Sequence, residues 1–279
     1  MSKGNALIVA VNGIDSRQYN VAEGFVPDIH VELDLPKYAS LLSERNFRIT
    51  QIKGTEATAQ RVLDEMRLAA NSVEPGDLFV FVFSGHGGRF VPNHGTEPIN
   101  AMFLFDRMLL NKELHAIWNA FCAGARVVFL DGSCHSESML WNLQLGEVLS
   151  PSPAAEEMGT LETTSVPLDA MQRIYGASDA IRERYDSLIG EAAESLPSCA
   201  VAELAACGNG EVAISYSELG SVFCDAIVKV MAAKTFHTYR DFSAQVVHAV
   251  HRLAKNQTPI LGYVGKNTRE LLSQYPLTV

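Results

Sequence analysis

The sequence has little positive charge and no long apolar run, and each shortage excludes a class of protein. Its 279 residues hold 22 Lys and Arg against 32 Asp and Glu, a net charge of −10. A nucleic-acid surface needs clustered Lys and Arg, so that function is disfavoured, whereas a cationic substrate would suit the acidic balance. No stretch approaches the roughly 20 apolar residues of a transmembrane helix, and the N-terminus lacks the cleavage region of a signal peptide. We expect a cytoplasmic protein that binds neither nucleic acid nor membrane.

Cysteine is also scarce and carries no metal-binding or disulfide pattern. The five cysteines are an odd number without CxxC spacing, which disfavours both a disulfide framework and a structural zinc site. Four of them stand among Ala, Val and Phe and are expected to be small buried hydrophobic residues: Cys122, Cys199, Cys207 and Cys224. Cys134 differs, because Gly, Ser and His surround it.

What is present in the first half is an alternation of apolar runs and amphipathic segments. Strands are expected at 5–12, 47–53, 78–84 and 126–131, and helices at 33–45, 55–73 and 110–122. The helix at 55–73 is expected to begin at a Thr55 cap. Continuous apolar strands that alternate with helices indicate a mostly parallel central sheet with helices on both faces, an α/β fold. In such sheets ligands bind at the carboxyl ends of the strands.

The composition changes after the fourth strand. Residues 127–172 contain no Lys or Arg, and Pro151, Pro153 and Pro167 fall among Ser, Thr and Glu. We expect an irregular connection, at least over 150–166. A helix at 168–195, a strand at 199–207 and helices at 217–233 and 239–255 are then expected to form a second, smaller unit.

Two of the predicted strands end in residues suited to nucleophilic catalysis. Leu78–Ser84 runs into Gly85, His86, Gly87 and Gly88, and the strand that ends at Asp131 runs into Gly132, Ser133 and Cys134. A thiol needs an adjacent imidazole to become a thiolate and to protonate the leaving amine. His86 precedes Cys134 by roughly fifty residues, the order and spacing of caspase-type cysteine proteases. The neighbouring glycines free backbone N–H groups for an oxyanion, and we assign this role to Gly87 and Cys134.

These residues also allow two other interpretations. His86 alone could be a hydrogen-bonded core histidine, and His86, Cys134 and His135 could bind zinc, although no fourth ligand is evident. The remaining histidines have no partner pattern and are expected to be surface or core residues: His30, His94, His115, His237, His248 and His251.

The two strand ends resemble the caspase-like cysteine peptidases, specifically the metacaspase and prokaryotic caspase-homologue branch. That family has Ser-Gly-His-Gly after one strand and Asp-Ser-Cys-His-Ser-Gly after a later one; here they read Ser84–Gly87 and Asp131–Glu137. Weaker matches extend over most of the chain: Asp34, Phe103–Asp106, Ala205–Glu211 and Thr258–Pro259. Prokaryotic relatives are often linked to defence or cell death.

The resemblance implies a caspase-hemoglobinase fold that cleaves peptide bonds through an acyl-enzyme, with Cys134 as nucleophile, His86 as acid/base and no cofactor. It implies an acidic pocket for a substrate Arg or Lys (the P1 residue, before the cleaved bond), built from Asp34, Ser84 and positions 131 and 132. The pocket acid of the family falls on Gly132 here, and Asp131 lies one position earlier, a shift that turns a strand side chain to the opposite face.

Two other departures concern calcium and the nucleophile loop. The Asp-Asp pair that binds calcium in many metacaspases reads Asn111-Lys112, and an ammonium repels Ca²⁺, so activity without calcium is expected. The glycine after Cys-His-Ser is Glu137.

The resemblance also implies an organisation and leaves three functions open. Residues 1–136 would be a large-subunit-like part, 137–197 a connection and 198–279 a small-subunit-like part, within one caspase-like domain. The chain would be an endopeptidase preferring Arg or Lys and acting on proteins, with an activating partner possible. Alternatives are a catalytically weak scaffold, or a protease for small or neutral P1 residues that uses the space left by Gly132. With basic specificity, no cleavage is expected before Arg173 in the connection.

Overall fold

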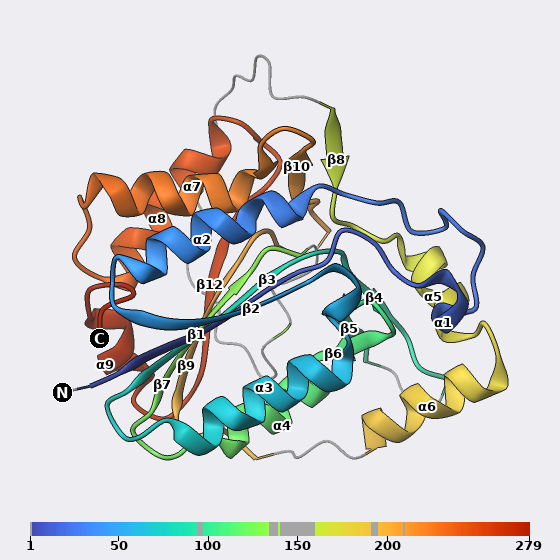
Figure 1. Ribbon diagram of the computed structural model, residues 1–279, viewed down its shortest axis with the longest axis horizontal. Coiled ribbons are helices and arrows are strands. Elements are labelled where there is room, and N and C mark those ends of the chain that lie inside the picture. Colours follow the sequence, from blue (N-terminus) through green and yellow to red (C-terminus); the bar gives the residue numbers. More distant parts are fainter. Residues whose placement is uncertain (1, 94–96, 134–138, 140–159, 191–194, 209) are drawn as a thin grey trace.

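The computed structural model describes residues 2–93, 97–133, 139, 160–190, 195–208 and 210–279. A six-stranded sheet lies at the centre, in the order β12-β9-β7-β3-β1-β2 (Figure 1). Five of its strands are parallel and β12 is antiparallel. The strands are β1 (Gly4–Ala10), β2 (Phe47–Lys53), β3 (Leu78–Ser84), β7 (Arg126–Asp131), β9 (Ala200–Ala205) and β12 (Ile260–Gly265). The α/β architecture predicted from the alternation is confirmed.

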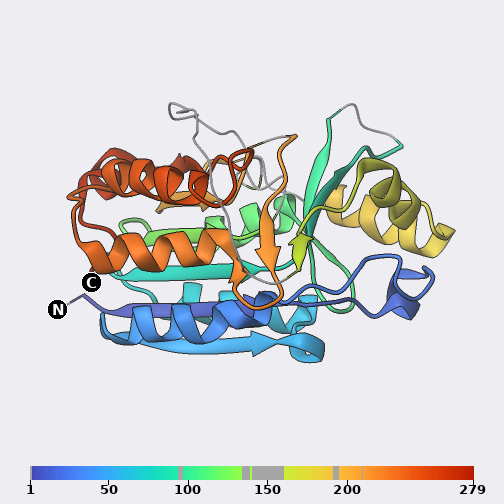
Figure 2. The same cartoon turned by 90° about the horizontal axis from the view of Figure 1, so that it is seen from above.

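Helices cover both faces of this sheet (Figure 1), and Figure 2 looks onto one of the two helical layers. One face packs against α2 (Asp34–Ser43), α7 (Val222–Ala233), α8 (Tyr239–His251) and α9 (Thr268–Ser273), and the other against α3 (Ala59–Ser72) and α4 (Asn111–Ala120). Alternate residues of each strand enter the two cores: on β3, Val80 and Val82 face α2 and α7, whereas Phe79 and Phe81 face α3 and α4. All seven residues of β3 are buried, as the continuous apolar run predicts.

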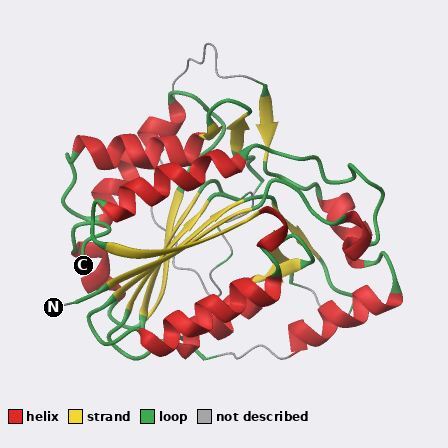
Figure 3. Cartoon of the chain, in the orientation of Figure 1, coloured by secondary structure: helices red, strands yellow, loops and turns green. Residues whose placement is uncertain are grey.

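Two small antiparallel sheets lie beyond the carboxyl ends of the parallel strands (Figure 3). One consists of β4 (Gly87–Phe90), β5 (Ile99–Phe103) and β6 (Met108–Leu110), and the other has the order β11-β10-β8. The strands of the second are β8 (Leu161–Thr163), β10 (Ile214–Tyr216) and β11 (Gly220–Ser221). The expectation of irregular structure over 150–166 was therefore wrong for 161–163. A three-residue strand is too short to show a period in the sequence.

A third core joins the sheet of β4, β5 and β6 to α1 (Ser16–Tyr19), α5 (Leu168–Tyr175) and α6 (Asp179–Gly190). The single helix expected at 168–195 is two helices, because α5 ends at Gly176 and Ser178 starts the next one by accepting the Ile181 N–H at 3.2 Å. The start of α3 also differs from expectation. Thr58, not Thr55, caps it, and residues 54–56 form a separate 3₁₀ turn (η2, Gly54–Glu56).

A second short 3₁₀ turn, η1 (Val31–Leu33), leads into α2. Among the described residues no helix is both long and apolar enough to cross a membrane.

Candidate active site

The predicted catalytic strands end side by side at one edge of the central sheet. β1 and β3 are paired so that Ala10 lies opposite Ser84, and β3 and β7 so that Phe83 lies opposite Asp131. The chain runs outward to β2 on one side of β1 and returns to β3 on the other, which makes this edge a topological switch point. His86 follows two residues after β3 and therefore lies at the position where α/β sheets bind ligands.

His86 is held by the loop that precedes α2. Its side chain is buried, its Nε2 lies 2.7 Å from the Pro27 carbonyl oxygen, and its ring meets Phe103 edge-on with centroids 6.4 Å apart. A carbonyl oxygen only accepts, so Nε2 must carry the proton. Nδ1 is buried and makes no hydrogen bond within the described residues. In the neutral ring Nδ1 is then the basic nitrogen, and Pro27 fixes this tautomer.

The surroundings of His86 favour its neutral form. Burial lowers the pKa of His86, while the carbonyls of Pro27 and Thr164 and the carboxylates of Asp28 and Glu162 act in the opposite direction. A neutral imidazole can accept a proton from a thiol during nucleophilic attack. The imidazolium formed would be stabilised by the Pro27 carbonyl and the nearby carboxylates.

Cys134 lies outside the described residues, and the chain leading to it is bonded to β3. The Gly132 N–H donates to the Phe83 carbonyl at 2.7 Å. A Cβ at Gly132 would lie 2.8 Å from that same carbonyl oxygen and 3.5 Å from the Ser84 Cα. The last two residues of β3, Phe83 and Ser84, therefore fill the position beside Gly132, and it is not an open pocket. Glycine is required there because the two strand ends approach so closely.

Of the two predicted oxyanion donors, the structure describes one. The Gly87 N–H is already paired, because it donates to the Thr164 carbonyl at 2.9 Å. The Cys134 N–H lies outside the described residues.

Asp34 begins α2 and is completely buried, with partners from two distant parts of the chain. Ser84 Oγ donates to one carboxylate oxygen at 2.9 Å, as does Ser221 Oγ at 2.6 Å, and the Ser221 N–H donates to the other at 2.9 Å. Burial raises the pKa of Asp34 to about 6 in spite of these hydrogen bonds. Gly220, at a φ of 77°, allows this contact, because a Cβ there would lie 2.5 Å from Asp34 Oδ1. Asp34 thus joins Ser84, two residues before His86, to the start of α7.

Asp131 is also completely buried but lies on the opposite face of the sheet from Asp34. It shares the strand face of Phe129, which packs toward α3 and α4, and it accepts the Ser133 N–H at 2.9 Å and Ser133 Oγ at 2.7 Å on one oxygen. Its other oxygen has no hydrogen-bond partner within the described residues, and burial raises the pKa of Asp131 to about 7. The structure therefore brings Asp34, Ser84 and Gly132 together and leaves Asp131 apart from them.

Three residues at this site were not found from the sequence. Pro27 and Thr164 act through backbone carbonyls, for which no side-chain signal exists. Ser221 had a detectable signal, since its hydroxyl accepts the Cys224 N–H at 3.1 Å and caps α7, but the partnership with Asp34 spans 187 residues.

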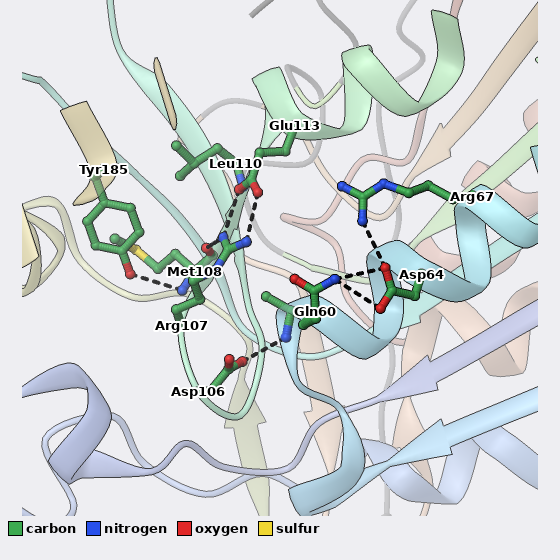
Figure 4. Close-up of polar contacts among 10 residues, drawn as sticks. Gln60, Asp64, Arg67, Asp106, Arg107, Met108, Leu110, Glu113 and Tyr185 are labelled. Atoms are coloured by element: carbon green, nitrogen blue, oxygen red, sulfur yellow. Dashed lines mark hydrogen bonds and ion pairs between the residues drawn. The ribbon is translucent and has the colours of Figure 1, made fainter. Parts of the chain in front are cut away.

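Asn111 and Lys112 lie in the chain between the two members of an ion pair, Arg107 and Glu113, which Figure 4 shows. Arg107 donates from both terminal nitrogens to the Glu113 carboxylate at 2.8 Å, and Asp106 accepts the Ala59 N–H at the start of α3 at 2.7 Å. Within the described ranges, no three His, Cys, Asp or Glu side chains are grouped to hold a metal ion. The acidic residues at this corner serve the helix starts and the Arg107 pair.

Two of the weaker family matches, Ala205–Glu211 and Thr258–Pro259, contact each other. The Thr258 N–H and hydroxyl both donate to the Glu211 carboxylate, at 2.7 and 2.9 Å. The loop that follows β9 is thereby attached to the segment that enters β12.

Comparisons with known proteins agree with this geometry. The family model for the caspase domain matches residues 30–271. Metacaspase-1 of Schizosaccharomyces pombe is 26% identical over 152 residues, which cover 50% of this chain and 35% of that protein, so the chain spans about a third of that relative's length.

Two solved structures extend the likeness to the fold. A protein from Geobacter sulfurreducens has a TM-score of 0.79 at 25% identity, with 99% of each chain covered. Caspase-1 from Spodoptera frugiperda has a TM-score of 0.56 at 12% identity, covering 93% of this chain and 86% of that one. The resemblance inferred from the two strand ends is confirmed. The chain belongs to the caspase domain family and carries the domain of a cysteine-type peptidase, a hydrolase.

Proposed function

We propose that this protein is a cysteine endopeptidase of the caspase and metacaspase type that cleaves proteins after Arg or Lys. Cys134 is the nucleophile and His86 the base. The observation that carries the proposal is the buried His86, whose Nε2 is committed to the Pro27 carbonyl while Nδ1 is left as the basic nitrogen. A core histidine with a purely structural role would be expected to satisfy both nitrogens.

The reaction follows from this tautomer. Nδ1 of His86 takes the thiol proton as the sulfur attacks the scissile carbonyl, and the same proton then passes to the leaving amine. The N–H groups of Gly87 and Cys134 stabilise the oxyanion. Water hydrolyses the resulting thioester with His86 again as base, which releases the acid product and restores the thiol.

Asp34 is the residue we assign to recognition of the substrate cation. Ser84 and Ser221 hold its carboxylate in a site without solvent, where a guanidinium or ammonium makes a strong charge-assisted contact. Gly132 and Ser84 form the adjoining wall. The small-residue alternative needs space beside Gly132, and the Phe83 carbonyl occupies that position.

Activity without calcium is part of the proposal. Lys112 stands where many metacaspases have a calcium-binding carboxylate, and neighbouring Glu113 is committed to Arg107. The positive charge of the Lys112 ammonium disfavours a divalent cation at this corner.

Purified protein is to be tested on fluorogenic peptides with Arg, Lys, Asp or Ala as P1 residue, beside a Cys134→Ala variant. Turnover of the Arg and Lys peptides that disappears in the variant supports the proposal. Cysteine-dependent turnover of the Ala peptide alone supports a small P1 residue, and no cysteine-dependent turnover on any peptide supports a scaffold.

A further inference from the structure

Residues 160–164 run as one extended strand along β10. β8 pairs antiparallel with β10, with Glu162 opposite Ser215. The pairing continues beyond both ends of β8, because the Thr164 N–H donates to the Ala213 carbonyl and the Ser217 N–H to the Thr160 carbonyl, each at 3.1 Å. β8 is an edge strand of this small sheet, and its place is one that a peptide in extended conformation could take.

This strand leads directly into the catalytic groups. The Thr164 carbonyl oxygen accepts the Gly87 N–H at 2.9 Å, and the Val166 N–H returns to the Gly87 carbonyl at 3.0 Å. Gly87 is the donor assigned to the oxyanion, so a carbonyl bound to it lies where a scissile carbonyl would bind. The Thr164 carbonyl is also one of the groups that raise the pKa of His86. Thr164 itself is fully buried.

A side-chain anchor lies two residues before Thr164. The Glu162 carboxylate receives the His30 backbone N–H at 2.9 Å and His30 Nδ1 at 2.5 Å, and Ser215 Oγ donates to it at 3.3 Å. His30 is more than half exposed, whereas the Glu162 side chain is only 13% exposed. The donors come from the loop before α2 and from β10. They form a carboxylate site next to the groove.

We propose that residues 160–165 occupy the substrate groove as an internal substrate mimic, and that His30 and Ser215, which hold Glu162, form a subsite for an acidic side chain at the third residue before the cleaved bond of a substrate. The proposal rests on the proposed function, because it takes Gly87 as the oxyanion donor. Thr164 occupies the P1 position and carries no positive charge. A peptidase that requires Arg or Lys there would hold this segment without cutting it.

An internal strand competes with every external peptide. Because the strand is tethered, its effective concentration is in the millimolar range. The apparent affinity for a substrate is then the intrinsic affinity multiplied by the fraction of molecules in which the groove is free. Removal of the Glu162 side chain from the internal strand should weaken its competition with external peptides. Removal of the corresponding glutamate from an external peptide should weaken the binding of that peptide.

The test uses the full chain with Cys134→Ala, so that binding is measured without turnover. The probe is a fluorescein-labelled hexapeptide with the sequence of residues 160–165, and anisotropy gives its Kd. Added Glu162→Ala should lower the Kd by about three- to tenfold, the range of the net contribution of a hydrogen bond, here in competition with the probe. Glu183→Ala, an exposed glutamate on α6, is the matched control and should leave the Kd unchanged.

The subsite is tested with a second hexapeptide that has Ala in place of Glu. It should bind about three- to tenfold more weakly than the first peptide to the Glu162→Ala protein, and added His30→Ala should remove that difference. Thermal melts of each variant identify any loss of folding. Equal Kd values with and without Glu162, or equal affinity of the two peptides, would overturn the inference. Absence of turnover in the wild type with these binding differences intact would count against the proposed function alone.

Discussion

Asp34 and Asp131 are both completely buried at the carboxyl edge of one sheet, and burial raises the pKa of both, to about 6 and about 7. Their hydrogen bonds differ. Asp34 receives three, from Ser84 and Ser221, which come from β3 and the start of α7. Asp131 receives two, both from Ser133 two residues later and both on one oxygen.

The difference separates two uses of a buried carboxyl. A carboxylate shared by elements 50 and 187 residues away couples two halves of a site, and a cation that binds there meets an already oriented partner. A carboxyl that bonds two residues ahead fixes a turn, here the one that leads to Cys134. We therefore expect mutation of Asp34 to change catalysis and mutation of Asp131 to change mainly stability.

The largest effect is expected from Asp34→Asn. The amide is nearly isosteric and can keep the hydrogen bond from the Ser221 N–H, but it removes the charge. The kcat/KM for Arg and Lys peptides should fall about 10- to 100-fold, the scale of a lost charge-assisted bond. Steady-state kinetics on Arg peptides measures it, with the exposed Asp179→Asn on α6 as the control. Unchanged kcat/KM in a folded Asp34→Asn variant would rule out Asp34 as the binding carboxylate.

A smaller effect is expected from Ser221→Ala. The Ser221 backbone N–H still reaches Asp34, whereas the hydroxyl bond to Asp34 at 2.6 Å and the cap on the Cys224 N–H are lost. The Arg-peptide KM should rise by about three- to tenfold with little change in kcat, because the orientation of Asp34 loosens while the His86 chemistry is untouched. Ser40→Ala, an exposed serine on α2, is the matched serine control. A fall in kcat without a change in KM would contradict this assignment.

The parts of the site formed by residues near one another in the chain could be predicted from the sequence, and the parts formed by distant residues could not. β3 and β7 could be located because a buried parallel strand is a continuous apolar run, and His86 and Cys134 follow those runs directly. Asp34 and Ser84 came from the family resemblance. Their partner Ser221 could not be paired with them, because 187 residues of the chain separate it from Asp34.

The strands β8 and β10 and the contact between His30 and Glu162 were harder to predict from the sequence. β8 and β10 have three residues each, and they exist because each forms hydrogen bonds with a segment about 50 residues away. His30 had no partner pattern in the sequence, and its contact with Glu162 spans 132 residues. The direction of Asp131 could be foreseen, because strand alternation places it on the face of Phe129.

Asp131→Asn should change activity by less than about threefold, because the amide oxygen can accept both Ser133 bonds. Its effect lies in the pH dependence of stability. A carboxyl whose pKa is raised on folding contributes most stability below its unfolded pKa near 4, and that contribution is lost as the pH rises through its folded pKa of about 7. Between pH 4 and 8 the Tm of the wild type should therefore change unfavourably relative to that of the variant, by about 5 °C. Parallel Tm curves for the two proteins would show that Asp131 does not titrate in this range.

The smallest effect is expected from calcium. Neither buried aspartate belongs to a group of three acidic, His or Cys side chains that could bind a metal ion within the part of the chain that the structure describes. At the corner where many metacaspases bind calcium, Lys112 supplies a positive charge and Glu113 is paired with Arg107. Addition of millimolar Ca²⁺, or of a chelator, should change Arg-peptide turnover by less than about twofold. Because the Arg107 pair leaves Glu113 unavailable, the Lys112→Asp variant should remain calcium-independent unless Arg107→Ala is added. A strong calcium requirement in the wild type would place the ion elsewhere and reopen the roles of both buried aspartates.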